Sequence, residues 1–297
     1  MRKRFFGKGL LLCLSLILVS CSQINSMAVI TSEPTIETGA KWLKTTVGGV
    51  ERIYMVRIPP GISLSSPAPL VFFFHGLNTD YMWAAASGWS PLADKEGFVI
   101  VYPDGLHHSW NAGGCCGDAD KDNYPDVEFV RKILEEVKAI VPIDPKRIYA
   151  SGFSNGGFFA YRLGCEMADT FAAIAPVAGA LILDPCTPSQ PVSLIHIHGD
   201  QDTTVPFSSD QGNFVVSGKI FPHAEQGIAL WAGFDGCDSG PREKVTKLFT
   251  HTYYTGCASG TEVEVYLYKD QAHEWFNSDL TPINDLIWKF FEDHPKQ

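Results

Sequence analysis

Gly152-Phe153-Ser154-Asn155-Gly156 follows the apolar run Arg147-Ile148-Tyr149-Ala150 and precedes a helical pattern from Gly157 to Met167. A Gly-x-Ser-x-Gly segment at such a junction is typical of a sharp turn that raises a serine hydroxyl above the edge of a sheet. The two glycines let the strand and helix backbones approach each other without a Cβ clash. The segment therefore makes Ser154 a candidate nucleophile.

Apolar runs and helical patterns alternate along the rest of the chain. We expect strands at 51–58, 69–74, 98–102, 147–150, 171–177, 192–197 and 263–268, and helices at 127–140, 157–167, 228–234 and 283–291. Continuous apolar runs are typical of strands that are covered on both faces. The alternation predicts an α/β fold, in which a mainly parallel, doubly wound sheet carries helices on both faces. In such sheets the site lies at the carboxyl ends of the strands.

The composition is that of a globular protein. With 297 residues, 45% of them hydrophobic, the chain can bury a full core. We expect one domain over residues 41–297.

The N-terminus has the pattern of a targeting signal. Residues 1–20 combine four basic side chains with a mostly apolar stretch from Leu10 to Val19, which is too short to span a bilayer as a helix. Leu18-Val19-Ser20-Cys21 resembles a bacterial lipoprotein processing site, so we expect a lipidated Cys21 and a tether over 21–40. An ordinary secretory signal is the alternative. Membrane contact is expected only through the lipid.

The net charge and the spacing of possible metal ligands indicate which partners the chain is not expected to bind. Removal of residues 1–20 takes four of the 23 basic residues and none of the 33 acidic ones, which leaves a net charge of −14 (19 minus 33). Nucleic acid is therefore not an expected partner. We expect no metal site, because the chain carries no paired zinc-ligand spacing. We also expect a monomer without a cofactor.

An exported chain favours disulfides over free thiols. Six of the eight cysteines lie beyond Cys21, at positions 115, 116, 165, 186, 237 and 257. We expect Cys237 to pair with Cys257, and the vicinal Cys115 and Cys116 to reach Cys165 and Cys186.

A serine nucleophile needs a histidine base and an acid that orients it. The strand ending at Ile197 is followed by His198-Gly199-Asp200-Gln201-Asp202, which offers two carboxylates, and the last strand is followed by Ala272-His273-Glu274-Trp275. The chain order of serine, acid and His273 is that of α/β hydrolases. Asp200 and Asp202 are both candidates at this point.

The other histidines favour different roles. His75 and His198 stand beside glycines at strand ends, where we expect them to hydrogen-bond neighbouring loops, and His196 alternates within a strand as a core residue. His107 and His108 fall on the rim, where a solvated loop is the simpler interpretation.

Several spaced motifs together resemble one family of esterases. They are His75-Gly76, Ser109-Trp110-Asn111-Ala112-Gly113-Gly114-Cys115-Cys116-Gly117, Gly152-Phe153-Ser154-Asn155-Gly156-Gly157, Ala173-Ile174-Ala175-Pro176-Val177-Ala178-Gly179 and His198-Gly199-x-x-Asp202. In this order they resemble the polyhydroxybutyrate depolymerase and feruloyl esterase group, which is similar to carbohydrate esterase family 1 and has the α/β-hydrolase fold. The resemblance covers roughly residues 42 to 292.

The resemblance implies roles for particular residues. It makes Asp202, rather than Asp200, the acid, and it implies an oxyanion hole from the backbone amides of Leu77 and Asn155, a type of group worth about 3 kcal/mol per donor. The chain departs from the family at Pro125-Asp126-Val127, which we expect to affect only helix entry, and before His273, where the usual glycines are missing.

Two tryptophans are candidates for substrate contact. If Trp110 and Trp275 flank the cleft, their flat apolar faces would suit a sugar ring or a phenolic acid. The alternative for Trp110 is that it holds a long loop in place.

The residues together predict an exported serine carboxylic ester hydrolase that works through an acyl-enzyme. Feruloyl or acetyl esters of plant polysaccharides are the expected substrates. Short polyhydroxyalkanoate chains are the alternative substrate, acyl transfer to an alcohol is a second class of reaction, and a catalytically silent binding protein is a third class of function.

Overall fold

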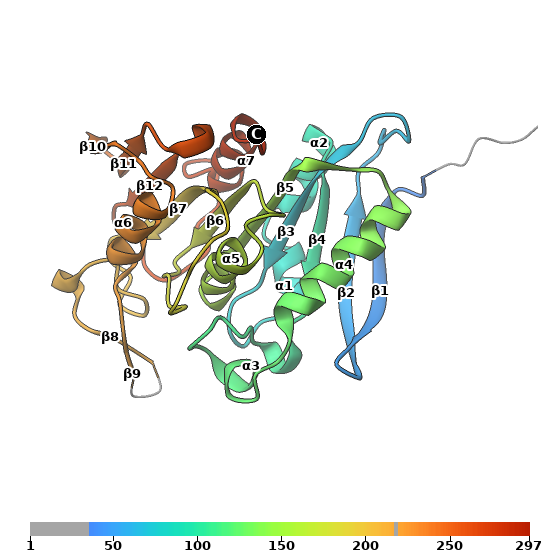
Figure 1. Ribbon diagram of the computed structural model, residues 1–297, viewed down its shortest axis with the longest axis horizontal. Coiled ribbons are helices and arrows are strands. Elements are labelled where there is room, and N and C mark those ends of the chain that lie inside the picture. The colour runs from blue at the N-terminus through green and yellow to red at the C-terminus, as the bar shows by residue number, and fades with distance from the viewer. Residues whose placement is uncertain (1–35, 217–218) are drawn as a thin grey trace, which may run out of the picture. The chain divides into compact units, whose positions relative to one another are not determined.

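The computed structural model describes residues 36–216 and 219–297. The predicted signal, Cys21 and residues 22–35 of the predicted tether lie outside these residues. A ten-stranded sheet runs through the described domain, and strands β8 and β9 form a separate hairpin (Figure 1). The strands are β1 (Gly39–Val47), β2 (Val50–Ile58), β3 (Ala68–Phe74), β4 (Val99–Pro103), β5 (Ile143–Phe153), β6 (Ala173–Val177), β7 (Ser193–Gly199), β8 (Phe214–Val216), β9 (Lys219–Phe221), β10 (Ser239–Val245), β11 (Phe249–Thr255) and β12 (Val263–Tyr268).

The middle of the sheet is parallel. The strand order is β1-β2-β4-β3-β5-β6-β7-β12-β11-β10, and every neighbouring pair from β4 to β12 is parallel. The pairs at the two edges are antiparallel: β1 with β2, β2 with β4, β12 with β11, and β11 with β10. The prediction of a mainly parallel sheet is confirmed.

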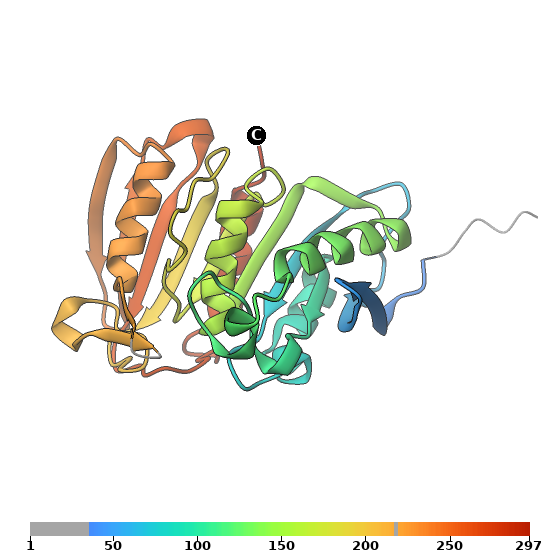
Figure 2. The ribbon, with the colours of Figure 1, turned by 60° about the horizontal axis from the view of Figure 1, so that its bottom comes forward.

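Helices cover both faces of the sheet, as Figure 2 shows for α4, α5 and α6 on one face and α7 on the other. The helices are α1 (Tyr81–Ala85), α2 (Trp89–Glu96), α3 (Gly117–Lys121), α4 (Asp126–Ile140), α5 (Asn155–Glu166), α6 (Ala224–Phe234) and α7 (Ile283–Asp293). Among the described residues no helix is both long and apolar enough to span a bilayer.

Strand β3 shows why its sequence is apolar throughout. Side chains alternate between the faces of a strand, so Leu70, Phe72 and Phe74 join the core beneath α4, α5 and α6. Val71 and Phe73 join the second core, beneath α1, α2 and α7. The side chains of β3 are therefore all buried, and none of them is polar.

The elements that the sequence did not predict are mostly short or polar. Strand β1 begins at Gly39, two residues before the predicted start of the domain, and its outward side chains include the exposed Trp42. Strand β10 is exposed at nearly every position, and β11 is half-buried throughout. β10 is the edge strand and β11 lies beside it, and antiparallel strands of this kind need no continuous apolar run.

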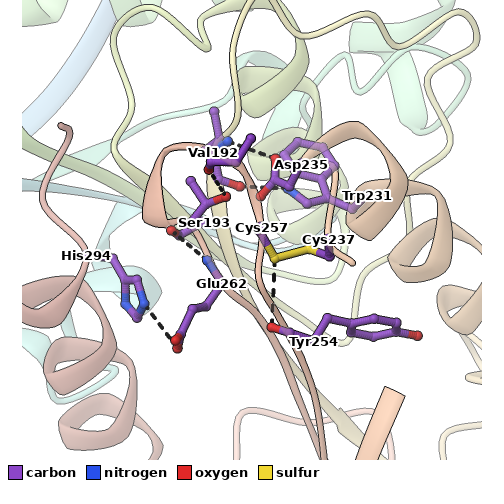
Figure 3. Close-up of a disulfide and its surroundings, with 11 residues drawn as sticks. Val192, Ser193, Trp231, Asp235, Cys237, Tyr254, Cys257, Glu262 and His294 are labelled. Carbon is purple, nitrogen blue, oxygen red and sulfur yellow. Dashed lines mark hydrogen bonds and ion pairs between the residues drawn. A yellow bond between two sulfur atoms is a disulfide. The ribbon is translucent and has the colours of Figure 1, made fainter. Parts of the chain in front are cut away.

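Three disulfides join the six cysteines of the domain. They are Cys115–Cys116, Cys165–Cys186 and Cys237–Cys257, the last of which is drawn in Figure 3. The predicted Cys237–Cys257 pair is confirmed. The prediction that the vicinal cysteines reach Cys165 and Cys186 is wrong, because the end of α5 brings the Cα atom of Cys165 within 5.4 Å of that of Cys186. The vicinal cysteines are bonded to each other.

Candidate active site

Ser154 occupies the sharp turn between β5 and α5. Its backbone has φ 54° and ψ −118°, a conformation that side-chain-bearing residues rarely adopt. The amide of Ser154 donates to the carbonyl of Val177 at 2.9 Å, which holds the turn against β6. A Cβ on Gly152 or Gly156 would collide with backbone atoms, so both glycines are required by the close approach of strand and helix.

Ser154, His273 and Asp202 form one continuous hydrogen-bonded set. The Oγ of Ser154 lies 2.8 Å from Nε2 of His273, and Nδ1 of His273 lies 2.7 Å from Oδ2 of Asp202. The carboxylate can only accept, so Nδ1 carries the proton and Nε2 is free to accept the hydroxyl proton of Ser154. The structure thus brings together all three residues that the sequence proposed for this role.

The structure also distinguishes the two candidate acids. Asp202 is fully buried, and its Oδ1 accepts from the amides of Thr204 and Val205 at 2.9 and 2.8 Å. Asp200 instead accepts from the amide of Asp270, at 2.8 Å. Burial alone would raise the pKa of Asp202, but hydrogen bonds from His198 and His273 outweigh it and lower that pKa well below the usual range. Asp202 is therefore ionised at neutral pH.

Two backbone amides stand where the sequence expects an oxyanion hole. The amide of Asn155 is the first in α5, so it has no partner within the helix. Leu77 follows Gly76, and Gly76 packs directly against Phe153, the residue before the serine. Both amides therefore belong to segments that border Ser154.

The side chain of Asn155 has a role that the sequence did not reveal. It is fully buried, its Oδ1 accepts from the amide of Trp110 at 2.7 Å, and its Nδ2 donates to the carbonyl of Trp110 at 3.0 Å. The residue next to the nucleophile thus holds the loop that follows β4.

Trp110 is not part of a substrate surface. Its side chain is fully buried, its Nε1 donates to the carbonyl of His75 at 3.0 Å, and its ring stacks on Phe159 with centroids 5.3 Å apart. The hypothesis of substrate contact is wrong for Trp110, because the ring is enclosed by β3, α5 and its own loop. The alternative, that it holds the loop, is what the structure shows.

A buried ion pair also supports the loop after β4 that carries Trp110 and Asn111. Arg52 on β2 pairs with Asp126 at 2.8 Å, and Asp126 also accepts from the amide of Asn111 at 2.8 Å. Arg52 donates in addition to the carbonyl of Asp104, at 3.2 Å. Pro125, where the chain departs from the family pattern, is the N-cap residue of α4 and so lies at the entry of that helix.

His75, His107 and His108 stand apart from the hydrogen-bonded set. His75 is fully buried, accepts the amide proton of Gly105 at Nε2 (2.9 Å) and donates from Nδ1 to the carbonyl of Gly76 (2.8 Å). Burial lowers the pKa of His75 to about 4, so the ring is neutral. His107 and His108 are exposed on the rim. The expected structural role of His75 is confirmed.

Trp275 lines a pocket beside His273. The pocket has a volume of about 320 Å³ and is bounded by Trp83, Ala86, Ser87, Trp275 and Asn277. The Trp275 ring is half-buried and donates from Nε1 to the carbonyl of Ser87 at 3.1 Å. Phe153 connects the pocket to the site, since its ring centroid lies 5.6 Å from that of Trp83 and 5.0 Å from that of His273.

Trp83 was missed by the sequence interpretation. It lies on α1, a helix of five residues that begins after Asp80, whose carboxylate accepts from the amides of Met82 and Trp83. The run of large side chains directly after a strand-end loop was the only signal for it. No group of three or more histidine, cysteine or acidic side chains in 36–216 and 219–297 is arranged to hold a metal ion.

The sheet, the strained serine turn and the hydrogen-bonded serine, histidine and carboxylate define an α/β hydrolase. Residues 52–197 match the family described as esterase PHB depolymerase, and the chain belongs to the polyhydroxybutyrate depolymerase and feruloyl esterase family. The family resemblance of the sequence is thus confirmed.

Comparisons with individual proteins agree with this family assignment. The chain is 33% identical over 224 residues to feruloyl esterase B of Piromyces equi, a match that covers 71% of this chain and 40% of that protein. It is 33% identical over 151 residues to the bifunctional acetylxylan esterase/xylanase XynS20E of Neocallimastix patriciarum, covering 50% of this chain and 22% of that protein. The chain therefore spans less than half of the length of either relative. The acetyl xylan esterase structure from Aspergillus awamori has the same fold, with a TM-score of 0.63 at 12% identity over 85% of this chain and 99% of that one.

Proposed function

We propose that the protein is a serine carboxylic ester hydrolase in which Ser154 forms an acyl-enzyme, His273 is first base and then acid, and Asp202 orients His273. The observation that carries this proposal is the unbroken set of hydrogen bonds from Ser154 through His273 to the buried Asp202.

The geometry supports a two-step reaction. Ser154 Oγ attacks the ester carbonyl carbon while Nε2 of His273 takes its proton, and the same imidazolium then gives that proton to the departing alcohol oxygen. In the second step His273 takes a proton from water, whose oxygen attacks the acyl carbon, and the imidazolium returns that proton to Ser154 Oγ as the bond between Oγ and the acyl carbon breaks. The amides of Leu77 and Asn155 stabilise the oxyanion in both steps, each contributing about 3 kcal/mol.

The pocket beside His273 supports an aromatic or sugar-bearing ester as substrate. Trp83 and Trp275 present ring surface there, and Ser87 and Asn277 add polar groups. Two relatives are named for feruloyl and acetylxylan esterase activity. We therefore propose feruloyl or acetyl esters of plant polysaccharides as substrates. Short polyhydroxyalkanoate chains are the second candidate, since the matching family is described by that activity.

The disulfides support an exported protein. Three disulfides in one domain fit an oxidising compartment rather than a cytosolic one. Lipid attachment at Cys21 remains our proposal from the processing-site pattern. Metabolic labelling with a fatty acid, compared between the native chain and a Cys21→Ala variant, tests it.

A substrate panel tests the activity. We expect hydrolysis of p-nitrophenyl acetate and methyl ferulate, and Ser154→Ala should retain less than about one per cent of kcat/KM. Ser63→Ala, in the exposed loop between β2 and β3, is the matched control and should behave as the native chain. Residual activity of Ser154→Ala near that of the control contradicts the proposal. The kcat/KM ratios among feruloyl, acetyl and hydroxybutyrate esters then identify the substrate.

A further inference from the structure

A chain of three buried side chains leads to Asp202 from the core. Tyr161 Oη lies 2.9 Å from Nδ1 of His196, and Nε2 of His196 lies 2.9 Å from Nδ1 of His198. All three side chains are fully buried. His196 and His198 lie two residues apart on β7, so their rings point to the same face of the sheet and stack at 5.2 Å.

The far end of this histidine chain (Tyr161, His196 and His198) contacts the acid and its loop. Nε2 of His198 lies 2.8 Å from the carbonyl oxygen of Val205 and 3.3 Å from Oδ2 of Asp202. Oδ2 is the oxygen that also accepts from His273. One carboxylate oxygen is therefore shared between His273 and the histidine chain.

The direction of every hydrogen bond in the chain follows from that carbonyl. A carbonyl can only accept, so His198 carries its proton on Nε2 and its Nδ1 must accept from Nε2–H of His196. His196 then has only Nδ1 left as an acceptor, and the hydroxyl of Tyr161 donates to it. The chain thus has one consistent arrangement of protons when both rings are neutral.

The surroundings of His196 keep its ring neutral. Burial, together with the neighbouring His198, lowers the pKa of His196 well below its usual value. The titratable groups in hydrogen-bond contact with the two rings are Tyr161 from α5 and Asp202 from the loop after β7, with His273 beyond Asp202. Phe207 packs against both rings, at 6.3 and 5.5 Å between centroids.

We propose that the histidine chain is a positioning device for the acid: it fixes the tautomer of His198, whose single Nε2–H is shared between the carbonyl of Val205 and Oδ2 of Asp202. This shared proton orients the carboxylate and withdraws negative charge from the oxygen that serves His273. This inference rests on the proposed function, because it assigns a role in the service of His273. Without the donor from His198, the Oδ2 oxygen carries more charge and stabilises the imidazolium of His273. The base then loses its proton at higher pH.

A pair of substitutions of equal length tests the chain. His198→Gln keeps an N–H donor near the position of Nε2, whereas His198→Met has a similar length and no donor. We expect His198→Met to lower kcat/KM for methyl ferulate by about 10- to 100-fold, the range of a hydrogen bond to a charged group. We also expect the acid limb of its pH profile, where kcat/KM falls as the base becomes protonated, to move to higher pH by about half a unit or more. His198→Gln should restore most of both quantities.

Tyr161→Phe is the second variant, since it removes one hydroxyl at the end of the chain remote from Asp202. Tyr161→Phe should move the acid limb of the pH profile in the same direction by a smaller amount. If circular dichroism shows that the His198 variants do not fold, this variant alone tests the proposal. The pH dependence of inactivation by phenylmethanesulfonyl fluoride, which reacts with the active serine, provides a readout independent of turnover. Because protonation of the base controls both rates, the two profiles should shift together.

Each outcome decides between the alternatives. A purely structural role predicts lower melting temperatures with the native acid limb in all three variants, and equal behaviour of His198→Gln and His198→Met. Either of these results overturns the proposal. If Ser154→Ala remains active, the proposed function itself fails. If Ser154→Ala is inactive and the acid limb does not move, the positioning role alone fails.

Discussion

Asp235 gives the sharpest prediction for stability. It caps the C-terminal end of α6, is fully buried, and accepts from the amide of Val192 at 3.0 Å through Oδ1 (Figure 3). Among the described residues its Oδ2 has no hydrogen-bond partner. Burial raises the pKa of Asp235 from 3.8 to about 7, against the lowering effect of the hydrogen bond from Val192. The folded chain therefore holds this carboxyl proton more tightly than the unfolded chain does.

The sign and size of the effect follow from that difference. The contribution to stability is complete below pH 3.8 and is lost as the pH rises through about 7. Between pH 5 and pH 8 the loss covers about two pKa units, or about 3 kcal/mol. An Asp235→Asn variant has no carboxyl proton to lose, so its stability relative to the native chain should rise by that amount over the same interval.

The assay compares melting temperatures of the native chain and Asp235→Asn at pH 5 and pH 8. Since 1 kcal/mol corresponds to about 2 °C in a domain of this size, the variant should gain about 6 °C relative to the native chain between the two values of pH. Asp238→Asn, at an exposed carboxylate nearby, is the control and should show no such gain. A pH-independent difference for Asp235→Asn would show that Asp235 does not change its protonation on unfolding, and would refute the reasoning.

Three further predictions concern the site and its supports. Asn155→Ala keeps the backbone amide but removes both side-chain hydrogen bonds to Trp110, so kcat/KM should fall about tenfold; unchanged steady-state kinetics would contradict the role of this side chain. Replacing Cys165 and Cys186 with serine opens a loop of 21 residues and should lower the free energy of unfolding by about 3 kcal/mol, measured with denaturant; an equal midpoint and slope would count against it. Trp83→Ala should raise KM for methyl ferulate more than for p-nitrophenyl acetate. Equal changes in the two KM values would show that the ferulate ring does not bind against Trp83.

The parallel part of the fold could be predicted because its strands are buried on both faces. Such strands are mostly apolar, and 69–74, apolar throughout, and 192–197, interrupted by Ser193 and His196, stand out for that reason. Strands β10 and β11 were missed because β10, at the edge of the sheet, leaves its side chains in water and β11, beside it, is only half-buried. Neither strand therefore carries a continuous apolar run.

The hydrogen-bonded set at the site could be predicted in part. The glycines around Ser154 reflect a backbone constraint, which leaves a mark on the sequence. The choice between Asp200 and Asp202 depends on which carboxylate turns inward, and residue type alone does not encode that. Trp110 shows the same limit in reverse: a tryptophan in a rim loop suits a substrate surface and a buried support equally well, and only tertiary packing distinguishes them.

Two other contacts could not be predicted from the sequence: the hydrogen bonds of Asn155 to Trp110 and the ion pair of Arg52 with Asp126. Both join segments that lie far apart in the chain. Asn155 and Trp110 are separated by 45 residues, and Arg52 and Asp126 by 74. Nothing local in either segment specifies its partner.

The alternation of side chains along β3 has a consequence for how the molecule unfolds. Because neighbouring residues such as Phe72 and Phe73 belong to opposite cores, disorder in one core disturbs the strand that builds the other. The loop that carries Leu77 continues directly from the same strand. Unfolding should therefore be a single cooperative transition, in which loss of enzymatic activity, loss of far-ultraviolet circular dichroism and exposure of tryptophan fluorescence coincide along a denaturant titration.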